Sequence, residues 1–364
     1  MKPFTSVILF RFVILLLLSG LTLLPAAAQR WTAQQANDWY KTQPFLVGAN
    51  FIPSTAINQL EMWQAESFDP ATIDRELGYA ESIGMNIMRV FLHNLIWEQD
   101  ADAYKKRIDQ FLQIADKHHI KIMFVLFDSC WNDDPKLGKQ PDPVTGKHNS
   151  GWVRGPGTKR LFDARTWAGL EQYTKGVLTA FGQDKRVLVW DLFNEPSNSG
   201  YNDAVMPLLT QTFIWAQAVR PSQPVTVGWW ADHPLSSDLS YSQSDIITFH
   251  NYAEAPKLEA QIIDLQKMGR PIICTEYMAR TRNSTFQTCL PVFKRYNVGT
   301  INWGLVKGKT NTIYAWDAPM PNGGEPKAWF HDIFRPDGLI FDASETTLIK
   351  QLATHDRTRR AVVY

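Results

Sequence analysis

Two glutamates each end a short apolar run, a position where a carboxylate is costly without a partner or a task. Glu195 closes the stretch WDLFNEP at residues 190–196, and Glu276 lies within IICTEYM at residues 272–278. An ionised acid is expensive to bury on an apolar strand unless it is paired. A structural interpretation gives Glu195 a helix-capping role and Glu276 an ion pair with Arg89. The functional interpretation is that both acids take part in chemistry.

Paired carboxylic acids suit one reaction in particular, the cleavage of a glycosidic bond. One acid protonates the departing oxygen, and the other attacks the anomeric carbon or activates a water molecule. Carboxyl groups about 5–5.5 Å apart indicate retention through a covalent intermediate, and a separation of about 6.5–9.5 Å indicates inversion. The stereochemical outcome therefore depends on how the fold places Glu195 and Glu276 relative to each other.

The elements that must position these acids are eight short apolar, β-branched or aromatic runs, which are typical of strands buried on both faces. They span residues 45–51, 86–92, 120–127, 187–193, 224–230, 245–252, 271–278 and 299–305. Helical segments lie between most of them, for example over residues 104–119 and 167–181. This alternation predicts an α/β fold, a single-domain (β/α)8 TIM barrel over residues 29–364, with catalysis at the C-terminal ends of the strands.

Helix-capping residues support the barrel, and the sequence after the first strand argues against an open sheet. Thr32 and Gln35 form a capping-box pattern ahead of the first strand, and Asp69-Pro70 begins another helix. Pro291 is expected to interrupt the helix after the seventh strand. A doubly wound open sheet is the alternative, but it requires a glycine-rich phosphate turn after the first strand, and the sequence there is GANFIPS.

Polar residues at the C-terminal tips of barrel strands are expected to be functional, whereas those elsewhere are structural. Besides the two glutamates, the expected tips carry Arg89 and His93 (second strand), Asp128 and Trp131 (third), Asn194 (fourth), Trp229 and Trp230 (fifth), His250 and Tyr252 (sixth) and Trp303 (eighth). His250 and Tyr252 are two residues apart and therefore point to one side of the strand. They could bond the same carboxylate or a substrate.

At these residues the sequence resembles a known family. WDLFNEP resembles the Asn-Glu-Pro signature of the clan A glycoside hydrolases, closest in style to glycoside hydrolase family 5. An isolated Asn-Glu-Pro is a weak signal, but the ordered set on eight spaced strands is specific. The set comprises Arg89, Asn194-Glu195, the His250-x-Tyr252 pair, Glu276 and Trp303.

The resemblance implies a retaining mechanism with one role for each acid. Glu195 would be the general acid/base, and Glu276 would be the nucleophile. Asn194 would bond the 2-hydroxyl of the substrate. Arg89 and Tyr252 would keep Glu276 ionised and oriented.

The resemblance also assigns supporting roles and exposes one departure. His250 would lie near the acid/base or the substrate, and Trp303 would form the floor of the −1 subsite. Many family members carry histidine at the tip of strand three, where this sequence reads FDSCWNDD at residues 127–134. His93 could take over that position. The departure puts cellulase or mannanase specificity in doubt and leaves the substrate open between xylan- or hemicellulose-type polysaccharides, arabinofuranosides and galactofuranosides.

The long loop expected after the third strand, residues 132–159, is rich in Gly, Pro and Asp and has no periodicity. Loops of this length are usually functional or disordered. A wall built by Trp131, His148, Asn149 and Trp152 would favour a pocket and exo action over an open groove. The alternative is a surface loop anchored by a few aromatic residues. After the eighth strand, Trp316, Trp329 and His331 could likewise reach the cleft or simply pack.

The first 28 residues have the pattern of a secretory signal peptide. Lys2 and Arg11 flank the start, residues 12–24 are almost continuously apolar, and Pro-Ala-Ala-Ala at 25–28 predicts cleavage after Ala28. An uncleaved anchor helix is the alternative. Cleavage would leave an exported protein, periplasmic or extracellular, without stable membrane insertion.

Charge and composition limit which classes of molecule the protein is expected to bind. The formal net charge is +1 and no basic block is present, which argues against nucleic acid and leaves a carbohydrate as the expected partner. No metal or organic cofactor is expected, because both candidate catalytic groups are carboxylates. Asp128, Asp133 and Asp134 match no calcium loop, and a metal-dependent hydrolase would need a ligand cluster that the spacing does not reveal. A non-catalytic glycan-binding barrel is the remaining alternative.

Overall fold

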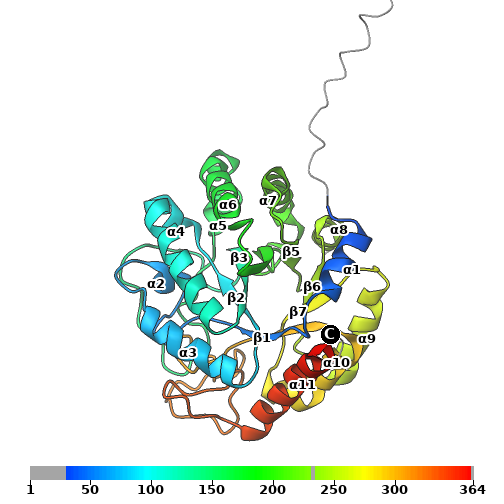
Figure 1. Ribbon diagram of the computed structural model, residues 1–364. Helices are drawn as coiled ribbons and strands as arrows, with labels where there is room; N and C mark the ends of the chain where they lie inside the picture. Colours follow the sequence, from blue (N-terminus) through cyan, green and yellow to red (C-terminus); the bar gives the residue numbers. More distant parts are fainter. Residues whose placement is uncertain (1–29, 231–233, 362–364) are drawn as a thin grey trace, which may run out of the picture.

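The computed structural model describes residues 30–230 and 234–361, so the predicted signal peptide over residues 1–28 lies outside the described residues. Eight strands form one parallel sheet in the order β5-β4-β3-β2-β1-β8-β7-β6 (Figure 1). They are β1 (Val47–Asn50), β2 (Ile87–Phe91), β3 (Lys121–Asp128), β4 (Val187–Asn194), β5 (Val225–Gly228), β6 (Ile247–His250), β7 (Ile272–Glu276) and β8 (Gly299–Asn302). All eight predicted strands are confirmed, each within a few residues of its expected bounds.

The ring closes between β5 and β6, the two ends of the sheet order. The backbone N–H of Asp245 donates to the carbonyl of Val225 at 2.8 Å, and that of His250 donates to the carbonyl of Trp229 at 2.9 Å. These bonds continue the parallel ladder across the gap. The predicted TIM barrel is therefore confirmed.

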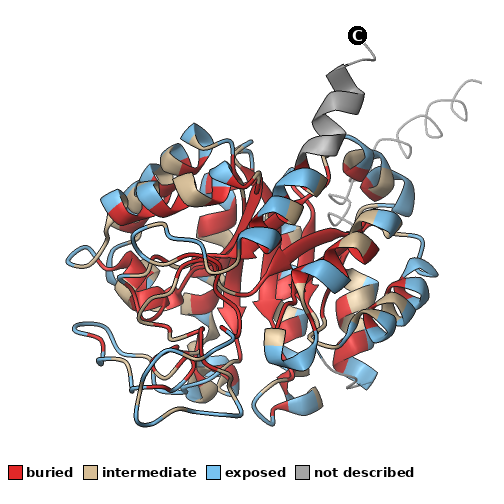
Figure 2. Ribbon diagram, turned by 90° about the horizontal axis from the view of Figure 1, so that it is seen from below, coloured by how far each residue is buried: buried red, intermediate tan, exposed pale blue. Residues whose placement is uncertain are grey.

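Helices surround the barrel (Figure 1). In the described residues they are α1 (Ala33–Lys41), α2 (Gln59–Trp63), α3 (Pro70–Ser82), α4 (Asn94–Lys117), α5 (Thr158–Leu161), α6 (Trp167–Phe181), α7 (Met206–Val219), α8 (Pro234–Gln243), α9 (Ala255–Gln266), α10 (Phe286–Tyr296) and α11 (Ala343–Ala361). Figure 2 shows their exposed faces turned outward and the strands buried beneath them. None of these helices is both long enough and apolar enough to cross a membrane.

Local sequence explains where several helices begin. The Thr32 side chain accepts from the backbone of Gln35, and the Gln35 side chain accepts in return, so the predicted capping box of α1 is confirmed. Asp69 caps α3 in the same way, with Pro70 in the first turn. The expectation for Pro291 is wrong, because α10 continues across it. Its buried face of Phe286, Leu290 and Phe293 holds the helix against the sheet despite the lost hydrogen bond.

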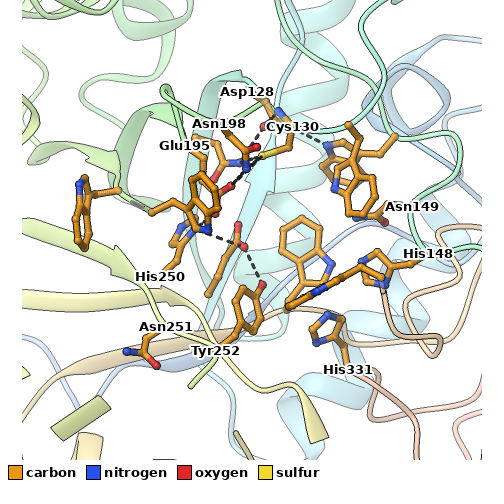
Figure 3. Close-up of a pocket in the computed structure, with 18 of the residues that line it drawn as sticks. Asp128, Cys130, His148, Asn149, Glu195, Asn198, His250, Asn251, Tyr252 and His331 are labelled. Carbon is orange, nitrogen blue, oxygen red and sulfur yellow. Dashed lines mark hydrogen bonds and ion pairs between the residues drawn. The ribbon is translucent and has the colours of Figure 1, made fainter. Parts of the chain in front are cut away.

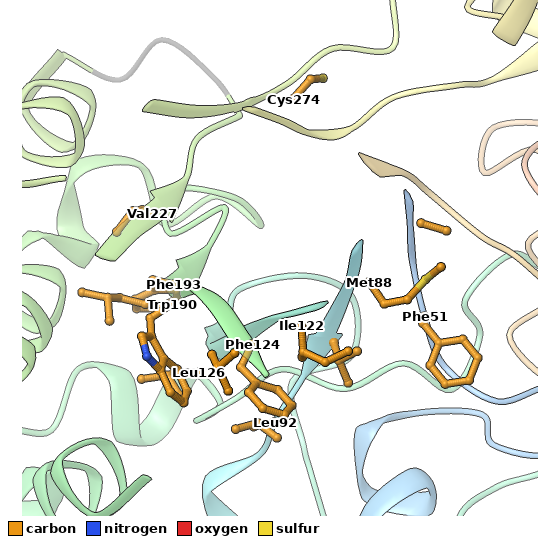
Figure 4. Close-up of a cluster of buried hydrophobic side chains, with 14 of the residues drawn as sticks. Phe51, Met88, Leu92, Ile122, Phe124, Leu126, Trp190, Phe193, Val227 and Cys274 are labelled. Carbon is orange, nitrogen blue, oxygen red and sulfur yellow. The ribbon is translucent and has the colours of Figure 1, made fainter. Parts of the chain in front are cut away.

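The core has two parts that together direct polar groups to one end of the barrel. Between sheet and helices lies a large apolar cluster in which Phe124 and Trp190 stack 5.7 Å apart (Figure 4). A second cluster near the N-terminal ends of the strands includes Leu46, Ile87 and Ile301 and is joined by side chains of α1. Because this end is filled with apolar side chains, the polar tip residues gather at the C-terminal end.

Two long segments follow strands on that face. We call residues 129–157 the β3 loop and residues 303–341 the β8 segment. Both lack long helices or strands and are held by turns and isolated bridges. The predicted long loop after the third strand is thus present, and α5 begins at its end.

Candidate active site

A pocket of about 800 Å³ opens at the C-terminal ends of the strands (Figure 3). Most of the residues predicted for the site line it. They are Asp128, Trp131, His148, Asn149, Trp152, Asn194, Glu195, Trp229, Trp230, His250, Tyr252, Glu276 and Trp303. Trp316 and His331 of the β8 segment line it as well, whereas Trp329 is fully buried in a separate apolar cluster.

Glu195 is buried and is held by three side chains. A hydrogen bond of 2.6 Å joins its Oε1 to Nδ1 of His250, and the Cys130 thiol lies 3.1 Å from its Oε2. The amide of Asn198 also donates to Oε2. Burial raises the pKa of Glu195, although the bonds from Cys130 and Asn198 oppose that shift. Burial also lowers the pKa of His250 to about 4, so its imidazole is neutral at pH 7.

The backbone at Glu195 explains how a strand end turns an acid toward the pocket. Its φ is +44°, in the left-handed region that non-glycine residues seldom adopt, and its N–H donates to the carbonyl of Gly228 at 2.8 Å. The pairing of β4 with β5 shifts register between Asp191 and Asn194, just before this residue. Strained backbone of this kind persists where the surroundings enforce it, commonly at functional sites.

Glu276 lies across the pocket with a donor on each oxygen. Nη1 of Arg89 is 2.9 Å from Oε1, which confirms the predicted pairing, and the Tyr252 hydroxyl donates to Oε2 at 2.8 Å. Burial raises the pKa of Glu276 and the nearby Glu195 adds to that effect, while His250, Arg89 and Tyr252 act against it. The bond to Arg89 thus offsets only part of the cost of burying this acid.

Arg89 is fully buried beneath the pocket and does not line it. Its Nε and Nη2 donate to Oδ2 of Asp191 at 3.0 and 2.7 Å. Its remaining donors reach Glu276, Oδ1 of Asn50 at 2.9 Å and Oδ1 of Asn194 at 2.6 Å. Asp191 and Asn50 were not predicted. The signal for Asp191 was available, since it is a second acid within the apolar run WDLFNEP and had to be paired.

Both the oxygen and the nitrogen of the Asn194 side-chain amide are hydrogen-bonded. Its oxygen accepts from Arg89, and its nitrogen donates to Oδ1 of Asp128 at 2.9 Å. Asp128 also accepts from the Trp152 indole at 2.7 Å, and burial raises its pKa to about 6. Asp133 and Asp134 have other partners, the backbone of Thr158 and the side chain of Lys136. The three aspartates therefore do not form a cluster.

Two expectations about the site need correction. His93 does not line the pocket; its Nδ1 caps α4 by accepting from the backbone of Leu95, and its Nε2 contacts the carbonyl of Arg154. It lies two residues beyond the end of β2, as the N-cap of α4. The expected lack of a ligand cluster is also wrong: single ligand atoms of Glu195, His250 and Glu276 all lie within 4.8 Å of one another. Sequence spacing missed this group because each member comes from a different strand.

Several pocket residues were not singled out from the sequence. They are Asn198, Ser199, Asn251, Gln261 and Arg282, which lie in turns or on helices without a motif. Cys130 is partly exposed in the pocket and touches Glu195, a contact that depends on the turn after β3.

The buried pairing of Arg89 with Asp191 generates a stability prediction. Asp191→Asn leaves the guanidinium with a single buried carboxylate partner, so the free energy of unfolding should fall by about 3 kcal/mol. Urea unfolding measures the change. Asp264→Asn is the matched control, since its pair with Lys267 is exposed and contributes at most about 0.5 kcal/mol. Equal, small losses in both variants would contradict the prediction.

Comparison with known proteins places this geometry in a family. The cellulase family (glycosyl hydrolase family 5) matches residues 53–308. A comparison with curated protein sequences gave no significant match. Solved structures similar to this chain include GH5_18 from Streptomyces cattleya in complex with Manβ1-4GlcNAc, with 10% identity, a TM-score of 0.58, and coverage of 86% of this chain and 81% of the other.

Two further neighbours share the fold at low identity. The endo-β-1,4-mannanase from Thermotoga petrophila has 13% identity and a TM-score of 0.57 over 88% of this chain and 78% of its own. The exo-β-1,4-mannosidase from Opitutaceae bacterium strain TAV5 has 16% identity and a TM-score of 0.59 over 93% of this chain and 62% of its own. With the family match covering most of the barrel, the chain belongs to glycosyl hydrolase family 5 and is a glycoside hydrolase.

Proposed function

We propose that this glycoside hydrolase cleaves O-glycosidic bonds with retention of configuration, through a covalent intermediate on Glu276. One observation carries the proposal: an oxygen of Glu195 and an oxygen of Glu276 lie within 4.8 Å of each other. Retaining enzymes hold their carboxyl groups about 5–5.5 Å apart, whereas inverting enzymes need about 6.5–9.5 Å to admit a water molecule. A closest approach this short between oxygens of the two carboxyl groups favours the retaining arrangement.

In the first step, a carboxylate oxygen of Glu276 bonds to the anomeric carbon while Glu195 gives its proton to the departing oxygen. The glycosidic bond breaks, and its electron pair leaves with that oxygen as a hydroxyl. In the second step, Glu195 takes a proton from water, and the water oxygen displaces Glu276 from the same carbon. Two inversions give net retention.

The electrostatics of the pair support this division of labour. Burial raises the pKa of Glu195, which favours the protonated acid needed in the first step. Once Glu276 is esterified it no longer carries a negative charge, so the pKa of Glu195 falls and the residue can act as a base. The neutral His250 bonds Glu195 at 2.6 Å and orients it throughout.

Substrate contacts follow from the same geometry. Asn194, fixed between Arg89 and Asp128, is proposed to donate to the 2-hydroxyl, where hydrogen bonds strengthen in the transition state. Trp303 is proposed as the floor beneath the reacting sugar, packed edge-to-face against Trp152 at 5.5 Å.

Substrate identity and export belong to the proposal as well. Similar structures include an endo-β-1,4-mannanase, an exo-β-1,4-mannosidase and a complex with Manβ1-4GlcNAc, so β-mannosides join the candidates. The others are xylan- or hemicellulose-type chains, arabinofuranosides and galactofuranosides. Hydrolysis of 4-nitrophenyl glycosides of each sugar chooses among them, and a glycan-binding barrel without activity would hydrolyse none. The pattern of residues 1–28 supports export.

The nucleophile role of Glu276 predicts a chemical rescue. Glu276→Ala should abolish turnover of an activated aryl glycoside, because no carboxylate remains to form the intermediate. Added azide should restore turnover and yield a glycosyl azide of the opposite anomeric configuration, which NMR identifies. Unchanged turnover without azide in this variant would overturn the assignment.

The acid role of Glu195 predicts dependence on the leaving group. Glu195→Gln should slow hydrolysis of glycosides with poor leaving groups far more than those with good ones, since only the former need protonation. Steady-state kinetics on a series of aryl glycosides with graded phenol pKa measures this. Equal losses across the series would count against general acid catalysis.

The thiol beside Glu195 predicts a shift in pH dependence. Cys130→Ala removes a hydrogen bond that lowers the pKa of Glu195, so that pKa rises. Because the first step needs protonated Glu195, the basic limb of kcat/KM should move to higher pH. Cys130→Ser retains a donor and should shift the limb less. A basic limb that stays in place or moves to lower pH in Cys130→Ala would refute the prediction.

A further inference from the structure

The β3 loop and the β8 segment are joined by hydrogen bonds on one side of the pocket. The backbone N–H of Asn149 donates to the carbonyl of Thr310 at 2.8 Å, and that of Met320 donates to the carbonyl of Gly146 at 3.0 Å. Nδ1 of His148 lies 2.8 Å from the carbonyl of Tyr314. We call this connection the loop bridge. Its parent strands, β3 and β8, are separated in the sheet by β2 and β1.

The loop bridge rests on the short turn after β1, which lies beneath it. The N–H of Lys309 donates to the carbonyl of Ser54 at 3.1 Å, and the Asn58 amide donates to the carbonyl of Gly151 at 2.8 Å. The bridge thus spans the mouth of the barrel above β1 and β2. Because the bridge is bonded to this turn, it forms a wall of the pocket on the side of β1 and β2.

Aromatic side chains fill the inner face of the bridge. The His148 ring lies 5.3 Å from Trp131, 5.3 Å from His331 and 5.9 Å from Trp316. His148 and His331 are buried, so the inner part of this cluster is closely packed. Figure 3 shows His148 and His331 at one end of the pocket and Glu195 with His250 at the other, with Tyr252 between them.

The side chain of Tyr252 links the nucleophile Glu276 to this aromatic wall. The Tyr252 hydroxyl touches Glu276, while the Tyr252 ring packs against Trp316 at 4.9 Å and His331 at 5.6 Å. A pyranose or furanose ring is similar in size to a phenol ring. A sugar that lies beside Tyr252 with its anomeric carbon at Glu276 would therefore have Trp316 and His331 at its far end.

On the opposite side, none of the described residues forms a comparable bridge across the pocket. Trp230 lines it and is 43% exposed, and Asn198 and Ser199 border the same side next to Glu195. Glu195 protonates the departing oxygen in the proposed mechanism, so the leaving group lies on this side. The sugar that is transferred to Glu276 then lies on the side of the loop bridge.

We infer that this enzyme acts from chain ends: it removes single sugars from the non-reducing end of its substrate, with the loop bridge blocking any sugar beyond the one that reacts. The inference rests on the proposed two-glutamate mechanism, which places the departing chain beside Glu195. Each cycle consumes one water molecule and gives a monosaccharide and a chain shortened by one unit.

The test has two stages that separate this inference from the proposed function. Wild-type enzyme is first assayed on 4-nitrophenyl β-mannoside, β-xyloside, β-glucoside, α-arabinofuranoside and β-galactofuranoside and on polysaccharides built from the same sugars. No hydrolysis of any of them would count against the proposed function, whereas hydrolysis of a polysaccharide without hydrolysis of any aryl monosaccharide would overturn the inference. The best sugar is then presented as a tetrasaccharide labelled at its reducing end with 2-aminobenzamide. We expect the labelled trisaccharide first, together with free monosaccharide. A labelled disaccharide at the earliest times, or no labelled trisaccharide, would overturn the inference.

A variant that accepts the longer substrate better than the wild type does cannot be explained by misfolding. For the same sugar, wild-type kcat/KM for direct release of 4-nitrophenol should be at least about tenfold higher with the 4-nitrophenyl monosaccharide than with the 4-nitrophenyl disaccharide, measured as nitrophenol formed together with intact disaccharide, because that cut alone places a second sugar against the wall. Trp316→Ala opens space next to Tyr252 and should reduce this preference several-fold. Trp230→Ala, the same change on the opposite side, should leave the preference unchanged. A preference that is unaffected by Trp316→Ala would contradict the role of the wall.

Discussion

The guanidinium of Arg89 holds the catalytic end of this barrel together. It is a charge buried completely, so the fold must surround it with acceptors, and it does so with side chains from β1, β4 and β7. Each acceptor is thereby fixed in turn: Glu276 on one side and Asn194 on another. A single cation thus sets the positions of groups that are far apart in the sequence. Without it, two acids and two amides would each lose a hydrogen-bond donor in a low-dielectric site.

The apolar half of the barrel makes this arrangement possible. Side chains such as Leu46, Ile87 and Ile301 fill the N-terminal half, so the polar network is confined to one end and can be satisfied there. The same confinement buries Glu195 and Glu276, which raises the pKa of both acids. The stability supplied by the apolar layers therefore offsets the cost of keeping reactive carboxyl groups out of water.

Much of this could be predicted from sequence, for physical reasons. Strands buried on both faces are continuous apolar runs, so all eight were recognisable, and the acids at their tips stood out as exceptions. What depended on the path of loops was not predictable. His93 follows the end of β2 by two residues and caps α4, and the contact of Cys130 with Glu195 is created by a turn that has no motif. Asp191 is a charged residue within an apolar strand, so its need for a buried cation could have been predicted from the sequence.

The loop bridge has a consequence for how a polymer would be handled. In the inferred exo mode, the freed sugar would leave through the opening by which the substrate entered. The shortened chain would then have to dissociate before that sugar could escape. This order of release disfavours processive digestion, in which an enzyme slides along one chain through many cuts. Each cut requires a new encounter, so the rate should follow the number of chain ends rather than the mass of polymer.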